Sequence, residues 1–319
     1  MTNANKQEYR QFCEQTPDMP VSLQPWWLDA VYCEDWDALL YKEKDNILAA
    51  MPYGRHKKYG FTTILQPKLT PTTGLWIGYP ENLKRLNRYA LEIKAMEFFA
   101  EQIDKIKPAY FQSMLHFSFT SWLGFYWHGY KQTTRYTYRF THLEDLDYTF
   151  SQCSTEVRKC IRKLEKQDFT VRNDLPLKQF YEINTLTYAR QGVKCPFSFE
   201  DFERIEAAAA ARNQSRRYAI CDKEGRVHSV TYVICSGDVW HSIFAGSDPE
   251  LRSSNAATLL LWHILCDAHS QGCKEYNFNG SVMRSIETFI RHFGAEQTPY
   301  MMIEKHYSKL YSFLKRLKH

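Results

Sequence analysis

Residues 247–261 read Ser-Asp-Pro-Glu-Leu-Arg-Ser-Ser-Asn-Ala-Ala-Thr-Leu-Leu-Leu, and this stretch does most to decide the fold. It follows an apolar strand pattern, turns at Asp248-Pro249 and opens a helix at Asn255-Ala256. The first helical turn has small side chains, so its N–H groups can approach a pyrophosphate closely, and the helix dipole favours the negative charge. An ordinary capped helix would show the same local pattern. The neighbouring segments therefore have to decide between the two interpretations.

Strands surround this stretch on both sides. The helix that it opens is expected to run to about Ser270 and to end at Gly272, because glycine is common just after a helix. Alternating apolar residues and turn signals predict the strands of a hairpin before it and one strand after it. These strands are residues 217–221, 226–234, 239–245 and 275–278.

The same order of elements occurs in the first half of the chain. A hairpin of residues 37–41 and 47–52 precedes a helix at 82–107, where apolar residues recur at helical spacing. Pro108 ends that helix and a strand is expected at 109–119. The two halves share this order without sequence identity, which predicts a faint structural repeat and two domains.

Composition narrows the class of protein. The 319 residues are 44% hydrophobic and 15% aromatic, enough for two packed cores. No apolar run approaches the roughly 18–20 residues of a membrane span, and the polar start shows no export signal. The nine cysteines are scattered without a Cys-x-x-Cys pair, a pattern typical of reduced thiols in a cytoplasmic protein. We therefore expect a cytoplasmic location.

Several common sites are not predicted. His263, Cys266 and His269 spread over a wide arc of one helix, so we expect no metal site there. The motifs of serine hydrolases, zinc proteases and P-loop nucleotide-binding proteins do not occur. The net charge of +5 does not by itself indicate nucleic-acid binding.

The positive charge gathers on a predicted helix at residues 154–167, and other helices are expected at 177–190, 198–212 and 306–317. The basic face of the first helix admits three interpretations: a solvated surface, a contact with tRNA or another phosphate-rich partner, or a contact with an anionic membrane. Its basic residues are Arg158, Lys159, Arg162, Lys163 and Lys166.

Arg252-x-x-Asn255-x-Ala257 resembles the acyl-CoA loop of GNAT acetyltransferases, (Gln/Arg)-x-x-Gly-x-(Gly/Ala), with Asn at the first Gly. The surrounding sequence resembles the Fem-like tandem-GNAT group of acyltransferases across the second half, and more weakly at Pro52 and Gly74-Leu75-Trp76 in the first. The segments that carry the resemblance are residues 154–166, Arg190-Gln191-Gly192, Gly246-Ser247-Asp248-Pro249-Glu250, Tyr276-Asn277-Phe278-Asn279-Gly280-Ser281 and Phe289-x-x-x-Phe293-Gly294.

The resemblance implies an α/β (α+β) fold of two GNAT-like lobes in tandem, each a mixed, mostly antiparallel sheet flanked by helices. The first lobe, residues 1–145, would be degenerate, and residues 146–303 would bind the acyl donor. A C-terminal helix at 304–319 would pack back on the first lobe.

The resemblance also implies where the substrates bind. Acetyl-CoA or another acyl-CoA would be the co-substrate, and its pyrophosphate would bind Arg252, Ser253, Ser254, Asn255, Ala256 and Ala257. The amine would arrive near residues 241–244 and 277–281. Candidate substrate-binding residues are Trp76, Arg190, Asn277 and Ser281.

Acyl transfer to an amine needs proton transfer, and the candidates for the catalytic group are His241, Asn279, Glu287 and Tyr300. Asn279 can orient a substrate, but a neutral amide is no base at neutral pH. His241 could equally be a partly buried strand histidine, Glu287 a solvated helix residue, and Tyr300 a tyrosine without special role.

One difference between this sequence and the family's motifs bears on the identity of the acyl donor. Aminoacyl-transferring members commonly have Phe-Lys-x-x-Phe-Gly where this chain has Phe289-Ile290-Arg291-His292-Phe293-Gly294, which favours an acyl-CoA donor over aminoacyl-tRNA. The leading hypothesis is an N-acyltransferase acting on an amine of a lipid- or nucleotide-linked cell-envelope or surface-polysaccharide precursor. The alternatives are a Fem-like aminoacyl-tRNA-dependent peptidyl transferase and a non-catalytic binding protein on a GNAT scaffold.

Overall fold

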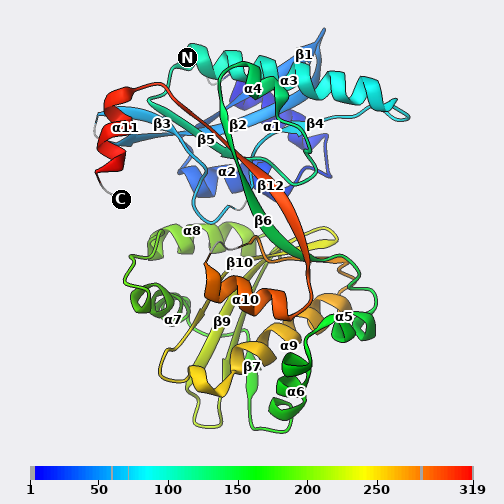
Figure 1. Ribbon diagram of the computed structural model, residues 1–319, viewed down its shortest axis with the longest axis vertical. Coiled ribbons are helices and arrows are strands. Elements are labelled where there is room, and N and C mark those ends of the chain that lie inside the picture. Colours follow the sequence, from blue (N-terminus) through cyan, green and yellow to red (C-terminus); the bar gives the residue numbers. More distant parts are fainter. Residues whose placement is uncertain (1–3, 59, 71, 281–282, 318–319) are drawn as a thin grey trace. The chain divides into compact units, whose positions relative to one another are not determined.

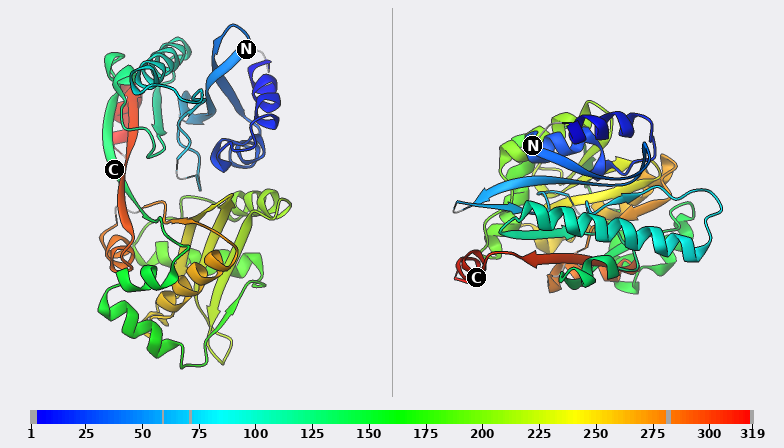
Figure 2. Two further views of the ribbon diagram at one scale, coloured as in Figure 1. Left: turned by 90° about the vertical axis from the view of Figure 1, so that its right-hand side faces the viewer. Right: turned by 90° about the horizontal axis from the view of Figure 1, so that it is seen from above.

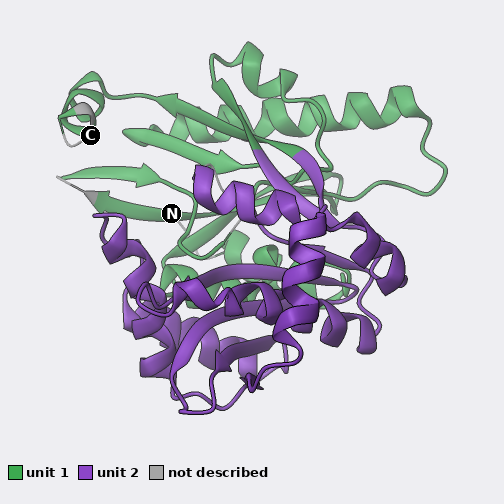
Figure 3. Ribbon diagram, turned by 60° about the horizontal axis from the view of Figure 1, so that its bottom comes forward, with its two compact units in different colours: residues 1–135, 299–319 green, residues 136–298 purple. Residues whose placement is uncertain are grey.

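The computed structural model describes residues 4–58, 60–70, 72–280 and 283–317. The chain divides into two compact units, residues 1–135 with 299–319 and residues 136–298 (Figure 3). It passes between them within two strands, β6 (Lys131–Phe140) and β12 (Glu296–His306). The sequence predicted boundaries at 145/146 and 303/304 instead, because neither strand was anticipated.

Unit 1 contains a mixed sheet in the order β1-β2-β3-β5-β12, with β4 paired to β2 (Figure 1). Among the strand pairs of its described residues, β3 and β5 are parallel and the others antiparallel. Its other strands are β1 (Trp36–Glu43), β2 (Asn46–Lys58), β3 (Phe61–Ile64), β4 (Trp76–Ile77) and β5 (Tyr110–Met114). Its helices are α1 (Ala4–Glu14), α2 (Pro25–Tyr32), α3 (Arg85–Ile106), α4 (Leu123–Trp127) and α11 (Lys309–Arg316), with a 3₁₀ turn at Val21–Leu23.

The long helix α3 supplies much of the core of unit 1 and runs alongside the strands (Figure 2). Its buried residues Met96, Phe99 and Ile103 recur every three or four positions, so they form one face. That face packs with Phe111 of β5 in one cluster. The apolar spacing that predicted this helix is therefore the spacing that attaches it to the sheet.

Unit 2 has the sheet order β6-β11-β10-β9-β8-β7, antiparallel except for the pair β10 and β11. The strands not yet given are β7 (Thr170–Arg172), β8 (Ser215–Cys221), β9 (Val227–Ser236), β10 (Val239–Ser247) and β11 (Glu275–Asn277). The helices are α5 (Leu146–Gln152), α6 (Thr155–Leu164), α7 (Leu177–Arg190), α8 (Phe199–Ala210), α9 (Ala256–Ser270) and α10 (Arg284–His292), with a 3₁₀ turn at Arg252–Ser254.

Helices cover both faces of the central strand β9. Residues 227–234 are all buried, although successive side chains of a strand point to opposite faces. Tyr232 packs against Phe202 of α8, with ring centroids 5.0 Å apart. The next residue, Val233, lies in a cluster with Leu260 of α9. The two helices therefore lie on opposite faces of the sheet.

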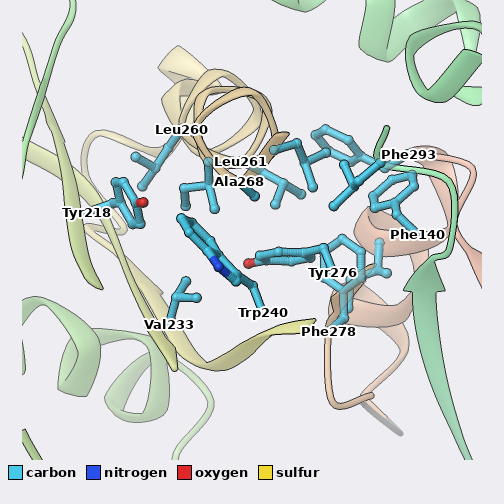
Figure 4. Close-up of a cluster of buried hydrophobic side chains, with 14 of the residues drawn as sticks. Phe140, Tyr218, Val233, Trp240, Leu260, Leu261, Ala268, Tyr276, Phe278 and Phe293 are labelled. Atoms are coloured by element: carbon cyan, nitrogen blue, oxygen red, sulfur yellow. The ribbon is translucent and has the colours of Figure 1, made fainter. Parts of the chain in front are cut away.

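The core beside α9 is aromatic. Trp240 and Tyr276, which are register partners on β10 and β11, point toward the helix that carries Leu260, Leu261 and Ala268 (Figure 4). The predicted α/β fold with mostly antiparallel sheets and flanking helices is confirmed, including the hairpin, helix and strand order in both halves.

Some predicted elements differ in extent. The strand expected at 109–119 ends at Met114, and the helix expected at 306–317 begins only at Lys309. The helix starts late because β12 continues to His306 and Ser308 then caps α11, accepting a hydrogen bond from the Tyr311 N–H. None of the helices in the described part of the chain combines the length and apolar character that crossing a bilayer requires.

Gly246 fixes how closely α7 approaches β10. A Cβ at this position would lie 2.4 Å from the Cα of Asn184 on α7, well inside van der Waals contact. The neighbouring N–H of Ser247 donates to Oγ1 of Thr187 at 3.0 Å, so helix and strand are also joined by a hydrogen bond. The contact is between the backbone of β10 and the backbone of α7, so neither element can move aside without disturbing its own hydrogen bonds.

We expect Gly246→Ala to lower the free energy of unfolding by about 1–3 kcal/mol, because the added methyl group forces α7 away from the strand. Gly237→Asn is the matched control: Gly237 has φ +56° with nothing within 4 Å of a Cβ, and asparagine tolerates that backbone conformation. Urea denaturation followed by circular dichroism measures both. Equal effects of the two substitutions would contradict the close approach at Gly246.

Candidate active site

The start of α9 keeps the backbone shape that the glycine of an acyl-CoA loop provides. Asn255 has φ 57° and ψ 20°, a left-handed conformation. Asparagine adopts this conformation more readily than other side-chain-bearing residues. The replacement of Gly by Asn in the loop is therefore conformationally conservative.

The loop before α9 is held in place by side chains. The Oγ of Ser254 accepts a hydrogen bond from the Ala256 N–H at 3.2 Å and contacts Nδ1 of His228 at 2.8 Å. Nε2 of His228 in turn contacts Asp222 at 3.1 Å. The N–H of Ala257 has no protein acceptor among the described residues, so it can serve an anion at the positive end of the helix dipole.

Strands β10 and β11 pair in parallel over only three residues and then separate. Val239, Trp240 and His241 pair with Glu275, Tyr276 and Asn277. Just beyond, the register of β10 against β9 shifts between Ser242 and Phe244, which marks a β-bulge. The gap between the strands therefore opens immediately after His241.

Two asparagines stabilise this separation. Nδ2 of Asn279 donates to the Ser242 carbonyl at 2.8 Å and so takes up a carbonyl at the point of divergence. The Asn279 N–H donates to Oδ1 of Asn277 at 2.8 Å, and that oxygen also accepts from Oγ1 of Thr137 at 2.7 Å. Both predicted residues thus lie where the resemblance placed the acceptor, and both are already engaged with the protein.

His241 is the least engaged polar side chain at this point. Its Nδ1 is buried without a hydrogen-bond partner among the described residues. Burial lowers the pKa of His241 below the usual 6.5, although the hydrogen bond with Asn279 opposes the shift. The imidazole is therefore neutral at pH 7 and able to accept a proton.

Glu287, by contrast, has two partners. Its carboxylate accepts from the Tyr138 hydroxyl at 2.7 Å and pairs with Nε of Arg291 at 2.8 Å. The hydrogen bond from Tyr138, together with that from Arg291, lowers the pKa of Glu287, so it stays ionised and poorly basic. Ile290 is buried. The motif position that carries Lys in aminoacyl-transferring relatives thus holds a core residue, and the adjacent Arg291 is committed to Glu287.

The remaining predicted residues lie elsewhere. Trp76 belongs to unit 1, where its ring packs edge-on against Phe12 at 4.9 Å. Tyr300 also belongs to unit 1, and burial raises its pKa. Arg190 is exposed at the end of α7, and Ser281 lies outside the described residues.

The basic helix α6 packs beside α9. Its apolar residues Val157, Ile161 and Leu164 are buried, and Cys160 contacts Thr258 in the first turn of α9. Arg158 and Arg162 have protein contacts, with the Ser151 carbonyl and the Phe150 ring. The exposed lysines of α6 and the turn after it are Lys159, Lys163 and Lys166.

Sequence reasoning missed the contribution of β6 to this site. Thr137 holds Asn277, Tyr138 holds Glu287, and Arg139 forms an ion pair with Glu275, with Nε 2.7 Å from Oε1. The alternation of threonine, tyrosine and arginine at 134–139 is a strand signal that could have revealed β6. Its partners could not be read from it, because they lie about 140 residues away in the chain.

Residues 151–289 match the family model described as acetyltransferase (GNAT) domain. No curated protein matches the chain. Among solved structures, that of FemX has a TM-score of 0.66 at 14% identity, covering 100% of this chain and 99% of its own. L-PGS from Bacillus licheniformis has a TM-score of 0.56 at 12% identity, over 98% of this chain and 94% of its own.

A tandem GNAT protein from the clavulanic acid biosynthesis pathway is a third similar structure, with a TM-score of 0.53 at 13% identity over 86% of this chain and 83% of its own. The fold and the matched segment together define the class: the chain has the GNAT fold, and residues 151–289 match the acetyltransferase domain of that fold. Its two units share the fold of FemX and of the tandem GNAT protein, which confirms the predicted tandem architecture.

The left-handed conformation of Asn255 can be tested by stability. Asn255→Gly should leave the free energy of unfolding within about 0.5 kcal/mol of the wild type, because glycine accepts this backbone conformation. Asn255→Val should lower it by about 1–2 kcal/mol, since a β-branched residue is strained there. Urea denaturation measures both variants, and equal stabilities would show that Asn255 is not left-handed in solution.

Proposed function

We propose that the protein is a cytoplasmic N-acyltransferase that moves an acyl group, in the simplest case acetyl, from acyl-CoA to a primary amine. The observation that carries the proposal is the start of α9, where left-handed Asn255 and the N–H of Ala257 form an anion-binding turn. The residues assigned to the donor pyrophosphate are Arg252, Ser253, Ser254, Asn255, Ala256 and Ala257.

The chemistry follows from the position of His241. The amine nitrogen attacks the thioester carbonyl carbon, a C–N bond forms, and the C–S bond breaks. The proton lost by the amine passes to the neutral imidazole of His241, and CoA leaves as a thiolate that solvent protonates. Asn279 and Asn277 act as positioning residues, because they hold β10 and β11 apart beside His241.

The buried Ile290 and the Glu287–Arg291 ion pair support an acyl-CoA donor over aminoacyl-tRNA. For the acceptor we propose an amine of a lipid- or nucleotide-linked cell-envelope or surface-polysaccharide precursor. The chain shares its fold with L-PGS and with a domain of a putative lysylphosphatidylglycerol synthetase, whose name denotes a lipid product. Because the putative lysylphosphatidylglycerol synthetase has a similar fold, aminoacyl transfer stays a second candidate function.

Isothermal titration with acetyl-CoA tests the donor. We expect saturable binding, retained by Asn255→Gly and weakened at least about tenfold by Asn255→Glu, since a carboxylate beside the turn repels the pyrophosphate. The absence of acetyl-CoA binding by the wild-type protein, or equal binding by the Glu variant, would exclude this donor site.

Replacement of His241 tests the base. We expect His241→Asn to reduce kcat about 10²–10⁴-fold in an acetyl-transfer assay with a primary amine. A base must be deprotonated to act, so kcat/KM of the wild type should fall on acidification only below the usual histidine pKa of 6.5. His263→Asn, a change at an exposed histidine of α9, is the matched control. Unchanged kcat in the His241 variant would rule out its role as base.

The exposed lysines of α6 separate the two donors. Because α6 contacts the first turn of α9, we expect Lys159→Gln with Lys163→Gln to raise KM for acyl-CoA about tenfold at unchanged kcat. Lys178→Gln with Lys194→Gln, at exposed lysines of the same unit, is the control. Activity that requires charged tRNA, with salt-sensitive tRNA binding lost in the first variant, would instead establish the aminoacyl alternative.

A further inference from the structure

The last helix, α11, is attached to unit 1 along one side only. Ser308 caps it, and its single buried aromatic residue, Tyr311, is 4% exposed. The Tyr311 ring packs against Phe61 of β3 at 5.6 Å and against Tyr110 of β5 at 6.2 Å. These contacts fix the orientation of the helix on the sheet.

The other side of α11 presents an apolar stripe, which we define as Leu310, Phe313 and Leu317. These side chains are 59%, 58% and 68% exposed, and their spacing of three and four residues places them in one row. Single exposed apolar residues are ordinary on a protein surface, but an aligned row that includes phenylalanine marks a contact site.

Positively charged residues lie at the start of α11 and on its attached side. Lys309 is exposed at its start, and Nζ of Lys315 lies 3.7 Å from the centroid of the Tyr110 ring. Next to the helix start, a hollow of about 1070 Å³ is lined by Tyr307 and Ser308. The charged residues that line this hollow are Arg55, Lys57, Lys107, Lys305, Asp35 and Asp104.

The basic side chains that line the hollow outnumber its two aspartates. Asp104 is bonded to Lys305 at 2.7 Å, so this carboxylate is already neutralised within the protein. Lys57 and Lys107 remain exposed toward solvent. The stripe therefore lies in a surface that attracts negative charge.

An apolar row on a helix that starts at an exposed lysine, next to a hollow lined by further lysines, is complementary to the interface of an anionic bilayer. There leucine and phenylalanine enter the acyl boundary and lysines meet phosphates. Nucleic acid would satisfy the lysines but leave the apolar row exposed. A second copy of the chain would bring the same positive surface against itself, and like charges oppose such contact. The basic helix α6 differs, because Val157, Ile161 and Leu164 are buried and leave nothing apolar to insert.

We propose that the stripe on α11 and the neighbouring lysines dock unit 1 peripherally on an anionic lipid surface. The proposal concerns unit 1 alone and does not depend on the identity of the acyl donor or acceptor.

Vesicle co-sedimentation of the full chain tests the proposal. We expect binding to phosphatidylcholine vesicles that contain phosphatidylglycerol and little binding to phosphatidylcholine alone. Leu310→Ser with Phe313→Ser should weaken binding at least about tenfold, because the replaced side chains no longer enter the bilayer. Lys57→Gln with Lys107→Gln should weaken it and reduce its dependence on salt.

Leu86→Ser with Tyr89→Ser is the matched control, because these α3 residues are 77% and 48% exposed and lie outside the stripe. It should bind as the wild type does, and circular dichroism should show all variants folded. Equal binding to both vesicle types, or wild-type binding by the α11 variant, would overturn the proposal. So would a wild-type dimer in analytical ultracentrifugation that the α11 variant converts to monomer without any vesicle binding.

Discussion

The separation of β10 from β11 is the constraint on which the rest of unit 2 depends. Parallel strands need a crossover, and α9 supplies it, starting beyond the end of β10 and returning the chain to the start of β11. The start of α9 and the opened strand edge then lie at the same end of the sheet. The topology alone therefore brings the positive end of the α9 dipole and the strand position of His241 to the same end of the sheet.

The asparagines show how this separation is maintained. A carbonyl at a point where two strands part loses its ladder partner, and a buried carbonyl without a partner is costly. The amide of Asn279 replaces the missing strand at Ser242, while Thr137 and the Asn279 N–H occupy Oδ1 of Asn277. The neutral residues that stand where relatives often carry an acid therefore stabilise the separated strands, and the proposed proton transfer falls to His241.

Local signals explain what could be predicted from the sequence. The bounds of α7, the three strands β8, β9 and β10, and the helix after Asn255 follow from periodicity and caps within a few residues. The strands β6 and β12 were missed, because their partners are far away in the chain and their sequences lack a long apolar run. The same difference applies to the candidate site: the turn at Asn255 and the strand that carries His241 have local signals, whereas the hydrogen bond between Glu287 and Tyr138 is long-range.

The two basic helices illustrate why charge counted along a sequence does not assign a partner. In α6 the apolar residues Val157, Ile161 and Leu164 are buried beside α9, so only its charged side chains are presented to a partner. In α11 one aromatic residue suffices to attach the helix, and Leu310, Phe313 and Leu317 are left over beside the lysines. The two helices differ in the fraction of their apolar surface that is buried on folding. That fraction depends on tertiary contacts, so two basic helices can present different surfaces, and the charge along the sequence does not assign a partner to either.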